Sequence, residues 1–278
     1  MSFVEVNGAK LHVEVEGNGP VLILVPGANG TGEIFKGITA YLQDRYELVC
    51  FDRRGYGTTE MTTPLPESAA DFSSHYRLTT DAEDVIALAN HFSPDQPVFV
   101  MGSSSGSIVA AEAFATAPDR IARIVLHESP ITTVIDTARQ QRLNKDAVET
   151  ALNGDFGGAR DKFAAAMQIQ PLDGKMMGFA ADSTKPDKKR MQGMLYWFKY
   201  EVLQYTSQTI DWDVFKANRD KVRLLIGTDS VGSVPPENTK AIGKMLNVPV
   251  TVIPGGHLGY AQKPEGFAET LAATLDMR

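Results

Sequence analysis

Residues 98–106 read Val-Phe-Val-Met-Gly-Ser-Ser-Ser-Gly, and this stretch decides the fold. An unbroken apolar run is typical of a strand buried on both faces of a parallel sheet. It leads directly into Gly-x-Ser-x-Gly, the sequence of a nucleophile elbow. In so sharp a turn from strand to helix, side chains two residues either side of the central serine would collide, so both places favour glycine. Of the three serines only Ser104 has glycine at both positions, which makes it the candidate nucleophile.

An alternation of apolar strands and amphipathic helices extends in both directions from this stretch. Further strands are predicted over Phe3–Val6, Lys10–Val15, Val21–Val25, Glu47–Phe51, Ile121–Leu126, Val222–Ile226 and Val250–Ile253, and helices over Asp81–His91, Ile108–Ala117, Pro236–Met245 and Pro264–Leu275. Strands that alternate with helices indicate an α/β fold with a mostly parallel, doubly wound sheet.

The alternation stops between Ile131 and Phe215. Charged helical segments and a Met- and aromatic-rich stretch over residues 191–205 replace it. We interpret this region as an inserted helical cap. The predicted organisation is therefore a core of residues 1–130 and 216–278, interrupted by a cap of residues 131–215.

Composition excludes several classes of function. The net charge of −7 argues against a nucleic-acid partner, because nucleic-acid affinity comes chiefly from Lys and Arg that neutralise phosphates. The single cysteine, Cys50, excludes an internal disulfide and a cysteine metal cluster, and we expect neither a metal nor an organic cofactor. The N-terminus lacks the pattern of a signal peptide, and no run approaches 18 apolar residues. A soluble, cytoplasmic protein without a membrane partner is predicted.

Two backbone N–H groups are candidates to bind an oxyanion. The helix that follows Ser104 presents free N–H groups at its positive end, which makes the N–H of Ser105 one donor. The second is expected from the loop over residues 26–30, where small residues let the backbone approach a ligand. Ala28 is the first candidate there and Asn29 the next. A turn that serves only tight packing would have the same composition.

His257 is the candidate general base. It follows a late strand through Pro-Gly-Gly and lies C-terminal to the nucleophile, as this type of site requires. A carboxylate must hold its imidazole and balance the imidazolium charge. Asp229 and Glu128 each follow a predicted strand at the carboxyl edge of the sheet, where ligands bind. The pattern alone does not choose between them.

Three segments together resemble the α/β-hydrolase fold family over nearly the whole chain: the elbow, residues 52–57 (Asp-Arg-Arg-Gly-Tyr-Gly) and residues 254–257 (Pro-Gly-Gly-His). More narrowly, the elbow followed by His-Glu-Ser-Pro at residues 127–130 is similar to the zearalenone lactone hydrolase-like subgroup. In that subgroup the triad acid is the Glu, so the resemblance implies Glu128 as the acid and oxyanion donors at Ala28 and Ser105.

The chain departs from the broader family at two places. A His-Gly pair is usual where Pro26 and Gly27 stand here. The position that usually carries the triad acid in the family is occupied by Ser230 here, and Asp229 precedes it by one residue. Because a shift of one residue at a strand end turns a side chain away, this departure also favours Glu128.

These residues predict a hydrolase of a small carboxylic ester or lactone that acts through an acyl-enzyme, with Ser104, His257 and Glu128 as its triad. A carbon–carbon bond hydrolase or a cofactor-free perhydrolase would use the same triad. A non-catalytic ligand-binding protein on this fold is the alternative of another class. In the cap, Met and aromatic side chains around Trp197 could line an apolar pocket and make Trp197 a substrate contact. The same stripe would equally form the core face of a helix.

Overall fold

The computed structural model describes residues 2–135, 137–178 and 188–277. Within these ranges one sheet has the order β1-β2-β4-β3-β6-β7-β8-β9, and β5 pairs with β2. Its strands are β1 (Ser2–Val6), β2 (Ala9–Glu16), β3 (Val21–Val25), β4 (Glu47–Phe51), β5 (Glu60–Met61), β6 (Val98–Ser103), β7 (Ile121–His127), β8 (Val222–Gly227) and β9 (Val250–Ile253). The strands from β4 to β9 along the sheet are parallel, whereas β2 pairs antiparallel with β1, β4 and β5.

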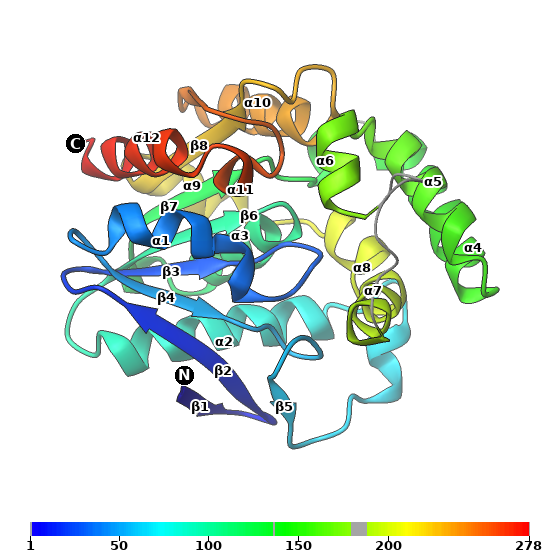
Figure 1. Ribbon diagram of the computed structural model, residues 1–278, viewed down its shortest axis with the longest axis horizontal. Helices are drawn as coiled ribbons and strands as arrows, with labels where there is room; N and C mark the ends of the chain where they lie inside the picture. Colours follow the sequence, from blue (N-terminus) through cyan, green and yellow to red (C-terminus); the bar gives the residue numbers. More distant parts are fainter. Residues whose placement is uncertain (1, 136, 179–187, 278) are drawn as a thin grey trace.

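Helices cover both faces of the sheet, and a further group lies beyond one end (Figure 1). They are α1 (Lys36–Leu42), α2 (Tyr76–Phe92), α3 (Ser105–Thr116), α4 (Thr137–Leu152), α5 (Phe156–Met167), α6 (Pro171–Met176), α7 (Lys188–Tyr200), α8 (Val202–Thr206), α9 (Trp212–Ala217), α10 (Val234–Leu246), α11 (Gly259–Gln262) and α12 (Pro264–Asp276). Short 3-10 helices span Gly32–Phe35, Glu67–Ala70, Pro118–Arg120, Thr132–Val134 and Arg219–Lys221.

The sheet separates two apolar cores, because side chains alternate between the faces of a strand. On β3, Val21, Ile23 and Val25 face the core shared with α2, α3, α9 and α10. Leu22 and Leu24 face the core shared with α1 and α12. All of β3 is buried, as its unbroken apolar run predicts. The predicted α/β fold with a mostly parallel, doubly wound sheet is confirmed.

Helix α2 begins at Tyr76, before the predicted start at Asp81. Its first turn holds Arg77, which is fully buried and lies 3.0 Å from Asp81 through Nη2 and Oδ1. A buried charged side chain weakens the hydrophobic pattern of this turn, although the neighbouring Leu78 is buried too. The prediction therefore missed this turn.

Helices α4 to α8, here called the cap, lie between β7 and β8 in the chain and beside one end of the sheet (Figure 1). Helices α4, α5, α7 and α8 share an apolar cluster that includes Val148 of α4, Phe163 of α5 and Phe198 of α7. Helix α9 spans residue 215, where the cap was predicted to end. Its Phe215 packs on Phe114 of α3, with ring centroids 4.8 Å apart, so α9 belongs with the core in its packing. A helix that crosses a bilayer needs about 20 apolar residues, and no helix in the described ranges meets that requirement.

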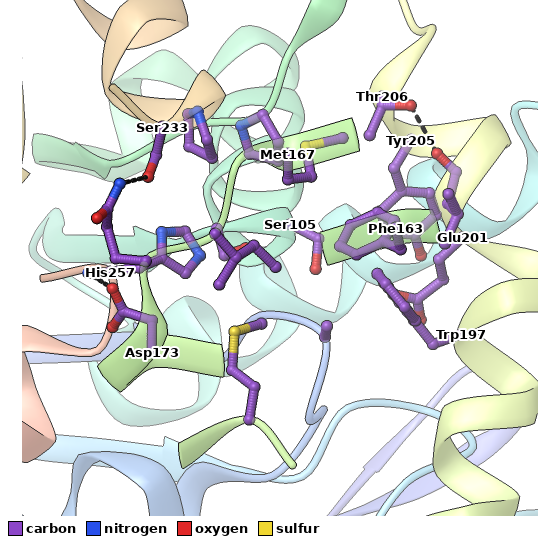
Figure 2. A pocket seen from close by; sticks show the side chains of 18 residues that line it. Ser105, Phe163, Met167, Asp173, Trp197, Glu201, Tyr205, Thr206, Ser233 and His257 are labelled. Atoms are coloured by element: carbon purple, nitrogen blue, oxygen red, sulfur yellow. Dashed lines mark hydrogen bonds between the residues drawn. The ribbon is translucent and has the colours of Figure 1, made fainter. Parts of the chain in front are cut away.

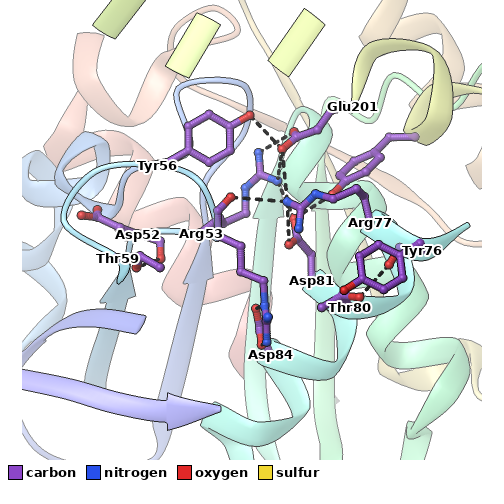
Figure 3. A network of polar contacts seen from close by, with 12 residues as sticks. Asp52, Arg53, Tyr56, Thr59, Tyr76, Arg77, Thr80, Asp81, Asp84 and Glu201 are labelled. Atoms are coloured by element: carbon purple, nitrogen blue, oxygen red, sulfur yellow. Dashed lines mark hydrogen bonds and ion pairs between the residues drawn. The ribbon is translucent and has the colours of Figure 1, made fainter. Parts of the chain in front are cut away.

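A buried ion network joins the cap to the core (Figure 3). Arg53, in the turn after β4, donates to both carboxylate oxygens of Glu201 at 3.1 and 2.8 Å. It also donates to Asp81 Oδ2 of α2 at 2.8 Å. Arg77 lies 3.8 Å from Glu201, and the Tyr56 hydroxyl donates to Glu201 at 2.8 Å. Two guanidinium groups thus face two carboxylates, each at most 2% exposed, and Glu201 connects the α7–α8 junction to the core.

The substitution Arg53→Met is expected to lower the free energy of unfolding by about 3–5 kcal/mol, because it removes the main cation beside the buried carboxylates of Glu201 and Asp81. Lys162→Met is the control. It breaks an exposed ion pair with Asp146 of 2.7 Å and should cost at most about 1 kcal/mol. Urea unfolding followed by circular dichroism measures both losses. Equal losses would contradict a stabilising role of the buried network.

Candidate active site

Ser104 lies at the turn between β6 and α3, with φ 56° and ψ −131°. This conformation is rare for a residue other than glycine and costs about 1–3 kcal/mol. The turn is tight on both sides. A Cβ atom on Gly102 would lie 2.3 Å from the carbonyl oxygen of Gly106, and one on Gly106 would lie 2.3 Å from that of Val25. Close packing therefore requires both glycines, and Ser104 is half-buried at the start of α3.

Glu128 and His257 are in direct contact. His257 Nδ1 lies 2.6 Å from Glu128 Oε2, and Glu128 Oε1 accepts the N–H of Gly227 at 2.8 Å. Glu128 follows β7 with φ 46°, and its own N–H donates to Leu225 of β8 at 3.0 Å. The side chain of Glu128 thus reaches from the end of β7 across the end of β8 to the histidine.

Burial and charge set the protonation of this pair. Burial of the imidazole lowers the pKa of His257, but the hydrogen bond and charge of Glu128, together with the charge of Asp173, outweigh burial and raise it. Burial raises the pKa of Glu128, but the hydrogen bond and charge of His257 bring it down to about 2. Glu128 is therefore ionised at neutral pH. Because a carboxylate only accepts, His257 Nδ1 is the donor, and Nε2 is left to exchange a proton.

Asp229 is exposed, and its Oδ1 accepts the hydroxyl of Thr228 at 2.9 Å. Ser230, at the usual acid position of the family, is buried. The carboxylate that meets the imidazole is the one at the end of the neighbouring strand β7. The geometry therefore favours Glu128 over Asp229 as the partner of His257.

One cavity brings the other predicted residues together. Ser104, Ser105, Ala28 and His257 line it from the core, and Trp197 lines it from the cap. Figure 2 shows His257 on one side and Trp197 on the opposite side. Much of the remaining wall is apolar and comes from Pro130, Phe163, Met167, Ile169, Met177, Val202 and Pro235. The predicted nucleophile, base and oxyanion donors share this cavity.

The loop over residues 26–30 packs against the nucleophile. A Cβ atom on Gly27 would lie 2.8 Å from the Cβ of Ser104, and the carbonyl oxygen of Gly27 accepts from Arg53 Nη2 at 2.8 Å. Ala28 lines the cavity, whereas Asn29 is exposed and donates to the backbone and side chain of Thr31. Of the two predicted donors in this loop, Ala28 is the one beside the cavity.

Sequence reasoning missed two carboxylates in the cavity wall, Asp173 and Glu201. Glu201 had a detectable signal, because it is the one acidic residue in the aromatic stretch 191–205. A lone carboxylate in an apolar stretch indicates a buried partner, here Arg53. Asp173 lies in an ordinary polar segment of the sequence and had no such signal.

A family model for the alpha/beta hydrolase fold matches residues 20–264 of the chain. The chain belongs to the α/β-hydrolase fold family. The uncharacterised hydrolase YraK of Bacillus subtilis is 24% identical over 277 residues, which cover 98% of this chain and 95% of YraK. The predicted family and the prediction of an enzyme are confirmed.

Solved structures of esterases share the fold of this α/β-hydrolase. A thermophilic esterase from Thermogutta terrifontis superimposes with a TM-score of 0.69 at 18% identity, over 95% of this chain and 92% of the esterase. The esterase RhEst1 from Rhodococcus sp. ECU1013 superimposes with a TM-score of 0.70 at 20% identity, over 99% of this chain and 98% of RhEst1. At these identities the likeness shows the fold.

In this α/β-hydrolase, Gly106→Ala is expected to destabilise the protein by about 1–3 kcal/mol, because the added methyl group would overlap backbone oxygens of Val25 and Pro26. Gly157→Ala is the matched control. Its methyl group would meet only Asp155 Oδ1, at 3.7 Å, and alanine in a helix should be neutral or stabilise by up to about 1 kcal/mol. Thermal denaturation compares the two. If Gly106→Ala is as stable as Gly157→Ala, the elbow is not as tightly packed as described.

Proposed function

We propose that the protein is a serine hydrolase that cleaves a carboxylic ester or lactone through an acyl-enzyme. One observation carries the proposal: His257 Nδ1 lies 2.6 Å from Glu128 Oε2 beside the cavity that Ser104 lines. A serine hydroxyl becomes nucleophilic when a base takes its proton, and the base needs a third group to hold its tautomer. Glu128 has the position and the low pKa for that third role.

The proposed reaction has two halves. Ser104 Oγ attacks the carbonyl carbon while His257 Nε2 takes the hydroxyl proton, and the tetrahedral intermediate collapses as His257 returns that proton to the leaving alcohol. Water then attacks the acyl-enzyme, with His257 again taking and returning a proton. The carboxylic acid leaves and Ser104 is restored. In a lactone the leaving alcohol stays attached to the acid, so one ring-opened product forms.

The N–H groups of Ala28 and Ser105 are proposed to hold the oxyanion. Both residues line the cavity beside Ser104. Ser105 opens α3, where the first N–H groups have no acceptor within the helix. Donors held rigidly at the place where charge develops lower the barrier without reorganisation, and the contact between Arg53 and Gly27 stabilises the loop that carries Ala28.

The cavity supports an ester or lactone with an apolar body. Aromatic, Met and aliphatic side chains dominate its wall, and such walls favour apolar ligands of varied shape. Trp197 is the proposed contact from the cap side. Solved structures with the same fold are named esterases. The lactone alternative rests on the similarity of the elbow and residues 127–130 to the zearalenone lactone hydrolase-like subgroup.

A fluorophosphonate is expected to label Ser104 covalently, and Ser104→Ala should abolish both labelling and ester turnover, because Ser104 is the serine at the turn between β6 and α3 and shares the cavity with His257. A chelator should change neither, since the proposed steps use no metal. Mass spectrometry of the labelled peptide and a panel of esters, lactones, amides and diketones measure the outcome. Labelling that persists in Ser104→Ala would refute Ser104 as the nucleophile, and a wild-type protein that takes no label would refute the serine mechanism.

Glu128→Gln is expected to lower kcat by up to about 10⁴-fold, because an amide cannot stabilise the imidazolium and favours the wrong tautomer. Asp229→Asn is the matched control, since it neutralises the other candidate carboxylate, whose hydrogen bond is to Thr228. It should leave kcat near that of the wild type. Steady-state kinetics with thermal unfolding separate catalysis from stability. A crippling Asp229→Asn beside an active Glu128→Gln would reverse the assignment.

A further inference from the structure

A carboxylate from the cap binds the backbone of residues 256–258, here called the histidine loop. Asp173 of α6 is 2% exposed, and it accepts the N–H of His257 at 3.1 Å through Oδ2 and that of Leu258 at 2.9 Å through Oδ1. Gln262 of α11 donates to the same Oδ1 at 2.7 Å, while its own Oε1 accepts the N–H of Gly256 at 2.6 Å. Figure 2 shows Asp173 directly beside His257. Asp173 thus binds the backbone of residues 257 and 258 directly and that of residue 256 through Gln262.

The loop is shaped around this carboxylate. A Cβ atom on Gly256 would lie 2.5 Å from Asp173 Oδ2 and 3.1 Å from its Cγ. The backbone of Gly256 does not lie in the left-handed region, so its conformation alone does not demand glycine. The close approach of Asp173 does. The glycine immediately before His257 therefore accommodates a residue of the cap.

Three titratable side chains surround the imidazole of His257. Glu128 binds Nδ1 from the end of β7, and Asp173 of α6 accepts the backbone N–H of His257. The ring of His127 is stacked 6.3 Å away, and burial lowers its pKa to about 4, so it is neutral at neutral pH. The charge of Asp173 adds to that of Glu128 in raising the pKa of His257.

We propose that Asp173 is a positioning residue that, from the cap, sets the alignment of His257. The inference rests on the proposed function. Glu128 holds the imidazole from the core, while Asp173 holds the backbone at residues 257 and 258 from the cap. Without the Asp173 carboxylate, the backbone N–H groups of residues 257 and 258 lose their acceptor, and the base loses its fixed place relative to Ser104.

The test is Asp173→Asn, which keeps the shape of the side chain but removes its charge and turns one acceptor into a donor. A small displacement of a catalytic group is costly, so kcat should fall about ten- to a hundredfold with a smaller change in KM. Labelling of Ser104 by a fluorophosphonate should slow by a similar factor. The acid limb of kcat/KM should move to lower pH, because loss of a neighbouring negative charge lowers the pKa of His257.

Asp155→Asn is the matched control. Asp155 is also a cap carboxylate that binds a backbone N–H, that of Gly158 at 2.9 Å, but it caps α5 and is exposed. This variant should lose a little stability and keep the wild-type kcat, labelling rate and acid limb. If Asp173→Asn behaves in the same way, Asp173 has a structural role alone and the inference is overturned.

Two further variants keep the test decisive. If Asp173→Asn does not fold, Gln262→Met removes one donor from Asp173 and the acceptor of Gly256. It should lower kcat and labelling in the same direction but by less, and wild-type values for it would overturn the inference. Ser104→Ala is measured alongside. Turnover or labelling that survives Ser104→Ala would overturn the proposed function and the inference together, whereas a dead Ser104→Ala beside a normal Asp173→Asn would overturn the inference alone.

Discussion

The turn at Ser104 constrains the rest of the structure. It forces a non-glycine residue to φ 56° between a buried strand and a helix, and burial of the neighbouring strands must offset that strain. Because no Cβ atom fits on Gly106 beneath Val25 and Pro26, the end of β3 packs directly against the start of α3. The loop with Ala28 is brought to the nucleophile by the same contact. The elbow therefore places the serine and both proposed oxyanion donors at once.

A second residue outside its preferred backbone region follows the next strand. Glu128 has φ 46° at the end of β7, and this conformation directs its carboxylate across β8 to His257. Backbone strain clusters at functional sites where surrounding contacts over-determine it. Here the two oxygens of Glu128 accept hydrogen bonds from a backbone N–H of β8 and from the imidazole. The proposed acid is thus held through both of its oxygens.

Two buried carboxylates of the cap, Asp173 and Glu201, line one cavity and lie on opposite sides of it in Figure 2. Glu201 binds Arg53, which in turn binds the carbonyl of Gly27 in the oxyanion loop. Asp173 binds the backbone of His257. Cap residues therefore bind Arg53, which holds the loop with Ala28, and the backbone of His257. These polar contacts attach the apolar cap side of the cavity to the core.

Local sequence patterns predict the alternating strands and helices, the elbow and the histidine loop, because a buried strand is continuously apolar and a tight turn needs glycine. The sequence by itself narrowed the acid to Glu128 or Asp229 but did not choose from the residues alone. Tertiary structure decided which carboxylate contacts His257, and it identified Asp173 and Glu201. The physical reason is separation along the chain: Glu128 and Asp173 lie 129 and 84 residues from His257. Hydrogen bonds between such distant segments depend on how strands and cap are packed, which no local pattern encodes.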